Sequence, residues 1–161
     1  MICAFTGHRP HKLPWQTDET DPRCLAVKEM IARKLQEAYD LGCREFLCGM
    51  AQGCDLFFAE AVLQLRQQDP EIRLTAMIPW PGQAKSWPIA DRERYEQLCG
   101  LCDRRICLAD TYSRNCMQLR NRAMVERAQV LISVYDGTAS GTGSTVRYAR
   151  QLGLRILPVW V

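Results

Sequence analysis

The segment of residues 131–145 constrains the fold more than any other part of this chain. It starts with an apolar, β-rich run at 131–135 and continues through a loop that holds Gly137, Gly141 and Gly143. Residues typical of a helix follow directly. Glycine lets the backbone come close to a ligand, and free N–H groups at a helix start favour a phosphate. The segment therefore indicates a strand–loop–helix unit with a ligand site at its loop.

Two further segments share this design, because β-rich runs also lead into glycines at 2–7 and 45–53. The carboxyl ends of parallel strands meet at one edge of a sheet, where the ligands of such sheets bind. We therefore expect the loops 7–10, 49–55 and 136–144 to share one crevice. A glycine after a strand is also an ordinary turn residue, so each loop taken alone has this second interpretation.

The order of elements predicts an α/β fold. Strands are expected at 2–6, 45–48, 73–78, 105–108, 130–135 and 155–159, and helices at 22–41, 54–68, 91–101, 116–128 and 144–152. This alternation predicts a single Rossmann-like domain over residues 1–161, with a mainly parallel sheet of five or six strands and helices on both faces. The irregular segments 9–21 and 79–90 follow strands, so we expect that both can cover the pocket.

Composition narrows the class of partner. No apolar run reaches the roughly 18 residues of a membrane span, and the first ten residues do not resemble a signal peptide. Nine cysteines without such a signal favour reduced thiols in the cytoplasm. The net charge of +3 makes nucleic acid an unlikely partner. Residues 104–161 hold nine arginines against three acidic residues, which suits a phosphate-bearing ligand or a solvated basic face.

Cys99 and Cys102 raise the question of a metal site. Structural zinc needs four ligands, usually from two such pairs, whereas this chain has one pair and only Cys107 near it. A redox pair would open a helix, whereas this one is expected to close one. We expect no metal site and no required cofactor.

Several short motifs resemble those of a known family. They are Gly7-His8-Arg9-Pro10, the segment Gly49 to Asp55, Pro79-Trp80 with Gln83, Lys85 and Trp87, the segment Arg120 to Val125, Tyr135-Asp136-Gly137 and Gly141-Thr142-Gly143. Together they resemble the YpsA-like branch of the SLOG superfamily, which joins DprA proteins with the lonely-guy phosphoribohydrolases. The resemblance covers the whole chain. It implies a Rossmann-like fold that binds a nucleotide or nucleotide-derived ligand, and no defined activity.

The loops and this resemblance together give the candidate ligand-binding residues. They are Gly7, His8, Arg9, Gly49, Met50, Ala51, Gln52, Gly53, Asp55, Asn121, Arg122, Asp136, Gly137, Ser140, Gly141, Thr142, Gly143 and Ser144. Arg9 and His8 can offer donors to an anion, or else Arg9 pairs with a surface acid while His8 caps its loop. Asp55 can contact a ribose hydroxyl, or it is placed at a helix start because the helix dipole favours a carboxylate there.

Three functions stay open. The first is a binding protein or sensor for a small nucleotide-derived molecule, such as an ADP-ribose-like or NAD-derived ligand. The second is a hydrolase that cleaves an N-glycosidic or phosphate bond. The resembling phosphoribohydrolases carry a glutamate after the last glycine loop, where this chain has Thr145 or Arg147, so only Asp55 and Asp136 stand as catalytic candidates. The third is a DprA-like module for single-stranded DNA. A homo-oligomer is compatible with each.

Overall fold

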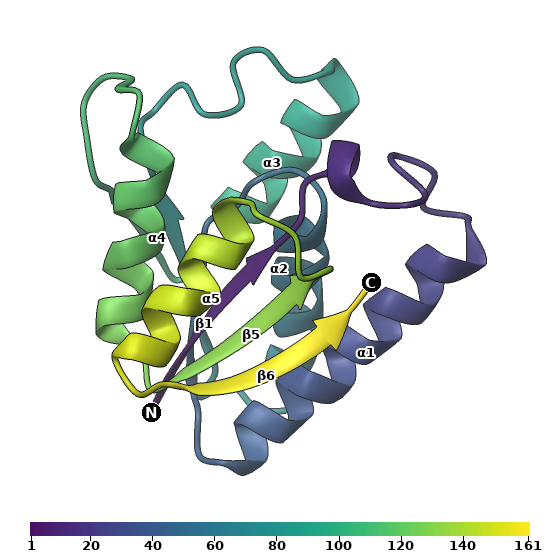
Figure 1. Ribbon diagram of the computed structural model, residues 1–161, viewed down its shortest axis with the longest axis vertical. Coiled ribbons are helices and arrows are strands. Elements are labelled where there is room, and N and C mark those ends of the chain that lie inside the picture. The colour runs from purple at the N-terminus through teal and green to yellow at the C-terminus, as the bar shows by residue number, and fades with distance from the viewer.

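Strands and helices alternate along the whole chain in a computed structural model that describes residues 1–161 (Figure 1). The strands are β1 (Ile2–Gly7), β2 (Glu45–Cys48), β3 (Arg73–Ile78), β4 (Arg104–Cys107), β5 (Val130–Tyr135) and β6 (Arg155–Trp160). The helices are α1 (Pro22–Asp40), α2 (Cys54–Arg66), α3 (Ile89–Leu101), α4 (Cys116–Arg127) and α5 (Gly141–Gln151), with a 3-10 turn at Pro10–Lys12. None of these helices has the length and apolar character needed to cross a bilayer.

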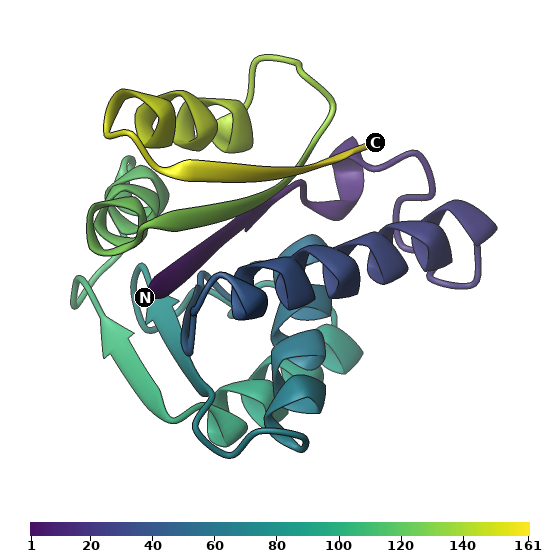
Figure 2. The same ribbon diagram turned by 90° about the horizontal axis from the view of Figure 1, so that it is seen from below.

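The six strands form one sheet in the order β4-β3-β2-β1-β5-β6, and every neighbouring pair is parallel. Figure 2 shows α4 and α5 on one face of the sheet and α1 and α2 on the other, where α3 packs on α2. The predicted Rossmann-like α/β fold, with helices on both faces, is therefore confirmed. The strand order reverses direction between β1 and β5, because β2 and β3 continue to one side of β1 and β6 lies beyond β5.

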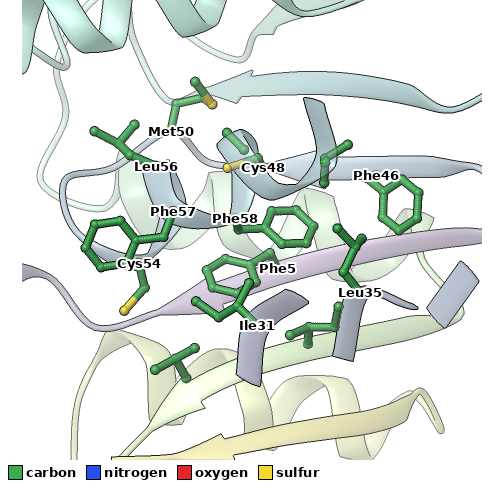
Figure 3. Packing of buried hydrophobic residues seen from close by; sticks show 14 of the residues in the cluster. Phe5, Ile31, Leu35, Phe46, Cys48, Met50, Cys54, Leu56, Phe57 and Phe58 are labelled. Carbon is green, nitrogen blue, oxygen red and sulfur yellow. The ribbon is translucent and has the colours of Figure 1, made fainter. Parts of the chain in front are cut away.

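Side chains of the central strands point alternately to the two faces of the sheet, and each face has its own hydrophobic core. Phe5 packs toward α1 and α2 and stacks on Phe58 with ring centroids 4.4 Å apart (Figure 3). Its neighbour Ala4 packs with Met124 of α4 on the opposite face. Burial on both faces explains why these strands read as continuous apolar runs.

Helix α5 begins at Gly141, three residues before the start at 144 that the sequence predicted. Glycine and threonine are weak helix formers, which is why residues 141–143 read as a loop. The Ser140 side chain decides the boundary, since its oxygen accepts a hydrogen bond from the Gly143 N–H at 3.0 Å. The glycine-rich segment is therefore the first turn of the helix.

A charged cluster anchors the segment between β1 and α1. Arg94 of α3 donates to Glu19 at 2.6 Å and to Glu60 of α2 at 2.7 Å, and Lys28 donates to Glu19 at 2.7 Å. Burial alone would raise the pKa of Glu19, but the hydrogen bonds from Arg94 and Lys28 lower it. The cluster ties Glu19 to α1 through Lys28 and to α3 through Arg94, which also joins α2.

We expect Glu19→Gln to lower the free energy of unfolding by about 1 kcal/mol at pH 7, since half-exposed ion pairs contribute in that range. A carboxylate whose pKa is lowered on folding stabilises the protein above its unfolded pKa and loses that effect as the pH falls. The difference between wild type and variant should therefore shrink below about pH 4. Urea denaturation of wild type and variant, at pH 7 and at a pH below about 4, measures this difference in stability. Glu29→Gln removes an exposed pair with Arg33 and should change stability less; an equal loss in both variants at pH 7 would contradict the anchoring role.

Candidate functional site

A crevice of about 250 Å³ lies at the carboxyl ends of β1 and β5, where the strand order reverses. Open parallel sheets bind their ligands at this position. The lining residues are Phe5, Thr6, Gly7, His8, Arg9, His11, Lys12, Ala51, Asp55, Met117, Arg120, Asn121, Ser140, Gly141 and Thr142. All three glycine loops contribute to the crevice, as the sequence predicted.

The start of α5 gives the crevice an electropositive wall. Ser140, Gly141 and Thr142 line it. The first N–H groups of a helix have no acceptor within the helix, and the helix dipole adds a partial positive charge there. The Gly143 N–H is already bonded to Ser140, so Gly143 offers no donor to a ligand. The free donors of this turn are the amides of Gly141 and Thr142.

Two cationic residues that come after β1 in the chain, Arg9 and Lys12, line the same crevice. Arg9 forms no ion pair within the chain, so its expected alternative role as partner of a surface acid does not hold. Lys12, at the end of the 3-10 turn, donates to the Ala139 carbonyl at 3.5 Å. Arg9 and Lys12 line the crevice together with the start of α5 and add full positive charges to its partial one.

Asp55 is the one carboxylate that lines the crevice. It is 5% exposed, and its Oδ2 accepts a hydrogen bond from the Ala51 N–H at 3.1 Å. Burial raises the pKa of Asp55, while the positive charges of Arg120 and Arg9 oppose that rise. Asp55 can therefore accept hydrogen bonds from ligand hydroxyl groups while tied to its own loop.

Arg120 is a crevice residue that the sequence analysis left out of the site. It is 3% exposed, and its Nη1 donates to the carbonyls of Gly49 and Met77 and to Gln83 Oε1. Burial lowers the pKa of Arg120. A signal was present, because Arg120 is spaced four residues from Cys116 and from Met124, which places it on the buried stripe of α4.

The loop after β2 is held in an unusual shape by Arg120 and Gln83. Gln83 Nε2 donates to the carbonyls of Gly49 and Met50 at 3.2 and 3.3 Å. Met50 has a φ of 56°, a left-handed conformation that is strained for this residue type. A Cβ at Gly49 would lie 2.5 Å from Arg120 Nη1, so only glycine leaves room for the guanidinium. The clamp fixes the loop that carries Ala51 and leads to Asp55.

His8 and Asp136 join the loops after β1 and β5. His8 Nε2 lies 3.0 Å from Asp136 Oδ1 and 3.2 Å from the Asp136 backbone nitrogen, and the tautomer decides which contact is a hydrogen bond. Asp136 Oδ1 also accepts hydrogen bonds from the Thr138 N–H and hydroxyl. Hydrogen bonds from Thr138 and His8 keep the pKa of Asp136 well below its usual range. Asp136 braces the loops after β1 and β5 and is not among the residues that line the crevice.

The other predicted site residues lie around the crevice. Gly49, Met50, Gly53, Gly137 and Gly143 shape the loops without lining it, and Gln52 donates to Asp91 at 2.9 Å on another side. Arg122 and Ser144 line a neighbouring groove between α4 and α5. Residues 79–90 do not cover the crevice, contrary to expectation, because Gln83 turns that segment under the loop after β2.

The cysteines form no disulfides, and no cluster of three or more His, Cys, Asp or Glu side chains is placed to hold a metal ion. Cys99 lies near the end of α3 and Cys102 directly after it. Burial raises the pKa of Cys102 to about 12 and also raises the pKa of Cys99. Neither is placed to act as a reactive thiolate, which agrees with the interpretation that this pair closes a helix.

The positions that could replace the phosphoribohydrolase glutamate carry no acid function. Thr145 is buried, and its hydroxyl donates to the Gly141 carbonyl at 2.9 Å within the helix. Arg147 lines the neighbouring groove rather than the crevice.

Comparisons with known proteins place this geometry in context. The model of the YpsA family, described as the YspA SLOG family, matches residues 3–151. A UPF0398 protein of Bacillus velezensis is 26% identical over 143 residues, which cover 88% of this chain and 78% of that protein. A UPF0398 protein of Bacillus anthracis is 26% identical over 144 residues, which cover 88% and 77%.

Two solved structures share the fold. DNA processing protein A (DprA) from Helicobacter pylori matches with a TM-score of 0.65 at 15% identity, over 98% of this chain and 64% of that one. DprA from Streptococcus pneumoniae matches with a TM-score of 0.52 at 11% identity, over 97% and 58%. This chain thus spans less than two thirds of either DprA chain. The H. pylori structure describes a single-stranded DNA binding mode of that protein, and at 15% identity its likeness to this chain shows the fold alone.

Proposed function

This chain belongs to the YpsA family of SLOG proteins, as its motifs indicated, and on that premise we propose that it is a cytoplasmic binding protein for a small nucleotide-derived ligand. The observation that carries the proposal is the start of α5, where the free N–H groups of Gly141 and Thr142 face a crevice that also holds Arg9 and Lys12. Nine unpaired cysteines are typical of a reducing compartment and support the cytoplasmic location.

The crevice offers complementary groups for two parts of a nucleotide. The start of α5 and the two cations suit a phosphate, because backbone N–H groups and a helix dipole favour an anion. Asp55 lines the same crevice and can accept hydrogen bonds from ribose hydroxyls, as acidic residues do in dinucleotide-binding sheets. The clamp of Arg120 and Gln83 holds the Asp55 loop before any ligand arrives, which reduces the entropy lost on binding.

A panel of AMP, ADP-ribose, NAD and a single-stranded oligonucleotide tests the proposal. We expect at least one of the small ligands to raise the melting temperature and to bind in calorimetric titration, since a ligand that binds only the folded state stabilises it. Adenosine, which lacks the phosphate, is the matched control and should bind more weakly. Equal affinity for adenosine and AMP, or binding of the oligonucleotide alone, would contradict the proposal.

A second candidate function is hydrolysis of the ligand, and the position of Asp55 favours it. A buried carboxyl with a raised pKa, lining a crevice, is the kind of group that serves as a general acid. Chromatography of each nucleotide after incubation tests this function. Product that forms with wild type and not with Asp55→Asn, while the variant still binds the nucleotide, would assign the reaction. Binding without product would leave the protein a sensor.

A further inference from the structure

A second cavity lies beside the crevice, in a groove between α4 and α5. Its volume is about 860 Å³, against about 250 Å³ for the crevice. Ligand pockets usually measure roughly 300–1,000 Å³, so the crevice alone is small for a nucleotide and the groove is ample for one. The two spaces adjoin, because Met117, Asn121, Ser140 and Gly141 line both.

The residues that line the groove carry positive charge only. Arg114, Arg122 and Arg147 line it, and none of the three forms an ion pair within the chain. No aspartate or glutamate is among its lining residues. A surface that served only solubility would mix charges of both signs. Three unpaired guanidinium groups around one hollow instead suit phosphate oxygens, which guanidinium binds with two donors at once.

One of these arginines is already oriented against an aromatic ring. The Arg122 guanidinium lies 5.0 Å from the centroid of the Tyr148 ring, and the Tyr148 hydroxyl donates to Glu126 at 2.7 Å. The hydrogen bond to Glu126 raises the pKa of Tyr148 and fixes the ring. A guanidinium plane supported in this way is a stacking surface for a nucleobase. The groove therefore offers both a phosphate site and a base site.

We propose that the groove binds the second nucleotide of a dinucleotide ligand whose first phosphate is held at the start of α5. The inference rests on the proposed function and specifies its ligand class: two nucleotides joined through phosphate, with the second phosphate against Arg122 and Arg147. Ser140 and Gly141 stand at the junction, where the ligand passes from the crevice into the groove.

Calorimetric titration with AMP and with the 5′-phosphorylated dinucleotide pApA tests this assignment. We expect wild type to bind pApA about tenfold or more tightly than AMP, because of the added charge-assisted hydrogen bonds. The double variant Arg122→Gln/Arg147→Gln should reduce the ratio of the two affinities to near one. Arg150→Gln removes an exposed charge from the same helix outside the groove and should leave the ratio unchanged. Melting temperatures confirm that each variant is folded.

The possible outcomes separate the two proposals. A ratio that stays high in the double variant, or that is near one in wild type, overturns the groove assignment and leaves AMP binding in the crevice intact. A single strand of twelve adenylate nucleotides is the third probe. If it binds far more tightly than pApA, and the double variant loses this extra affinity, the groove binds nucleic acid and the dinucleotide assignment is overturned. If neither AMP nor pApA binds wild type, the nucleotide function itself fails.

Discussion

Replacing Arg120 with methionine should lower the free energy of unfolding by about 3 kcal/mol, because it removes a buried donor from three acceptors. The carbonyls of Gly49 and Met77 and Gln83 Oε1 would lose the Nη1 donor, and water cannot replace it at a side chain that is 3% exposed. Methionine has a similar length and adapts to irregular space, so the loss reports the missing hydrogen bonds more than a cavity. Urea denaturation of both proteins measures the difference.

Arg122→Met is the matched control, because it makes the same substitution two residues away on an exposed part of α4. It should change the stability by less than about 0.5 kcal/mol. Gly49→Ala tests the clamp from its other side, since its Cβ would lie 2.5 Å from Arg120 Nη1 and must displace the guanidinium. Arg120→Met and Gly49→Ala damage the same clamp, so the variant that carries both should lose less stability than the sum of the two single losses. Additive losses, or a loss below about 1 kcal/mol for Arg120→Met, would show that the clamp is not what fixes the loop.

The sequence was sufficient for the fold because the central strands are largely apolar runs with a glycine at or soon after their ends. Strands were predicted at 2–6, 45–48 and 130–135, within one residue of β1, β2 and β5, and their loops do meet at one edge. Parallel strands impose that meeting whatever the loop sequences are. The start of α5 was misplaced, because a single hydrogen bond from Ser140 to the Gly143 N–H outweighs the weak helix propensity of residues 141–143.

The contents of the site were harder to predict than its position. Arg120 and Gln83 hold the loop after β2 through hydrogen bonds to residues at least 33 positions away, which no local pattern reports. The contacts of Asp136 with His8, which lies 128 positions away, could not be predicted from local sequence either. The groove could not be predicted either, because Arg114 and Arg122 meet Arg147 only through the packing of α4 on α5. Residues are assigned to a site reliably only when the tertiary contacts between elements are known.

Gly141→Asp should weaken nucleotide binding by about 10- to 150-fold while leaving the fold as stable as wild type or more so. A Cβ at Gly141 meets nothing within 4 Å, and the residue lines the crevice at the first position of α5. A carboxylate there would repel a phosphate and compete for the free N–H groups, which costs the ligand roughly 1.5–3 kcal/mol. The same carboxylate is favoured by the helix dipole, by about 0.3–1 kcal/mol, and replaces a weak helix former.

Gly141→Asp is expected to weaken binding but not to lower stability, so the two effects have opposite signs. Damage to the fold cannot explain lost affinity in a protein that melts at a higher temperature. Gly141→Asn has the same shape without the charge, so the difference between the two variants isolates electrostatic repulsion at the start of α5. Gly100→Asp adds the same charge at a glycine of α3 that is also open, with nothing within 4 Å of its Cβ, and should not affect binding. Calorimetric titration with AMP, paired with thermal melting, gives both quantities. If Gly141→Asp and Gly141→Asn bind AMP equally well, no anion sits at this helix start, and the crevice must recognise its ligand through Arg9, Lys12 and Asp55 alone.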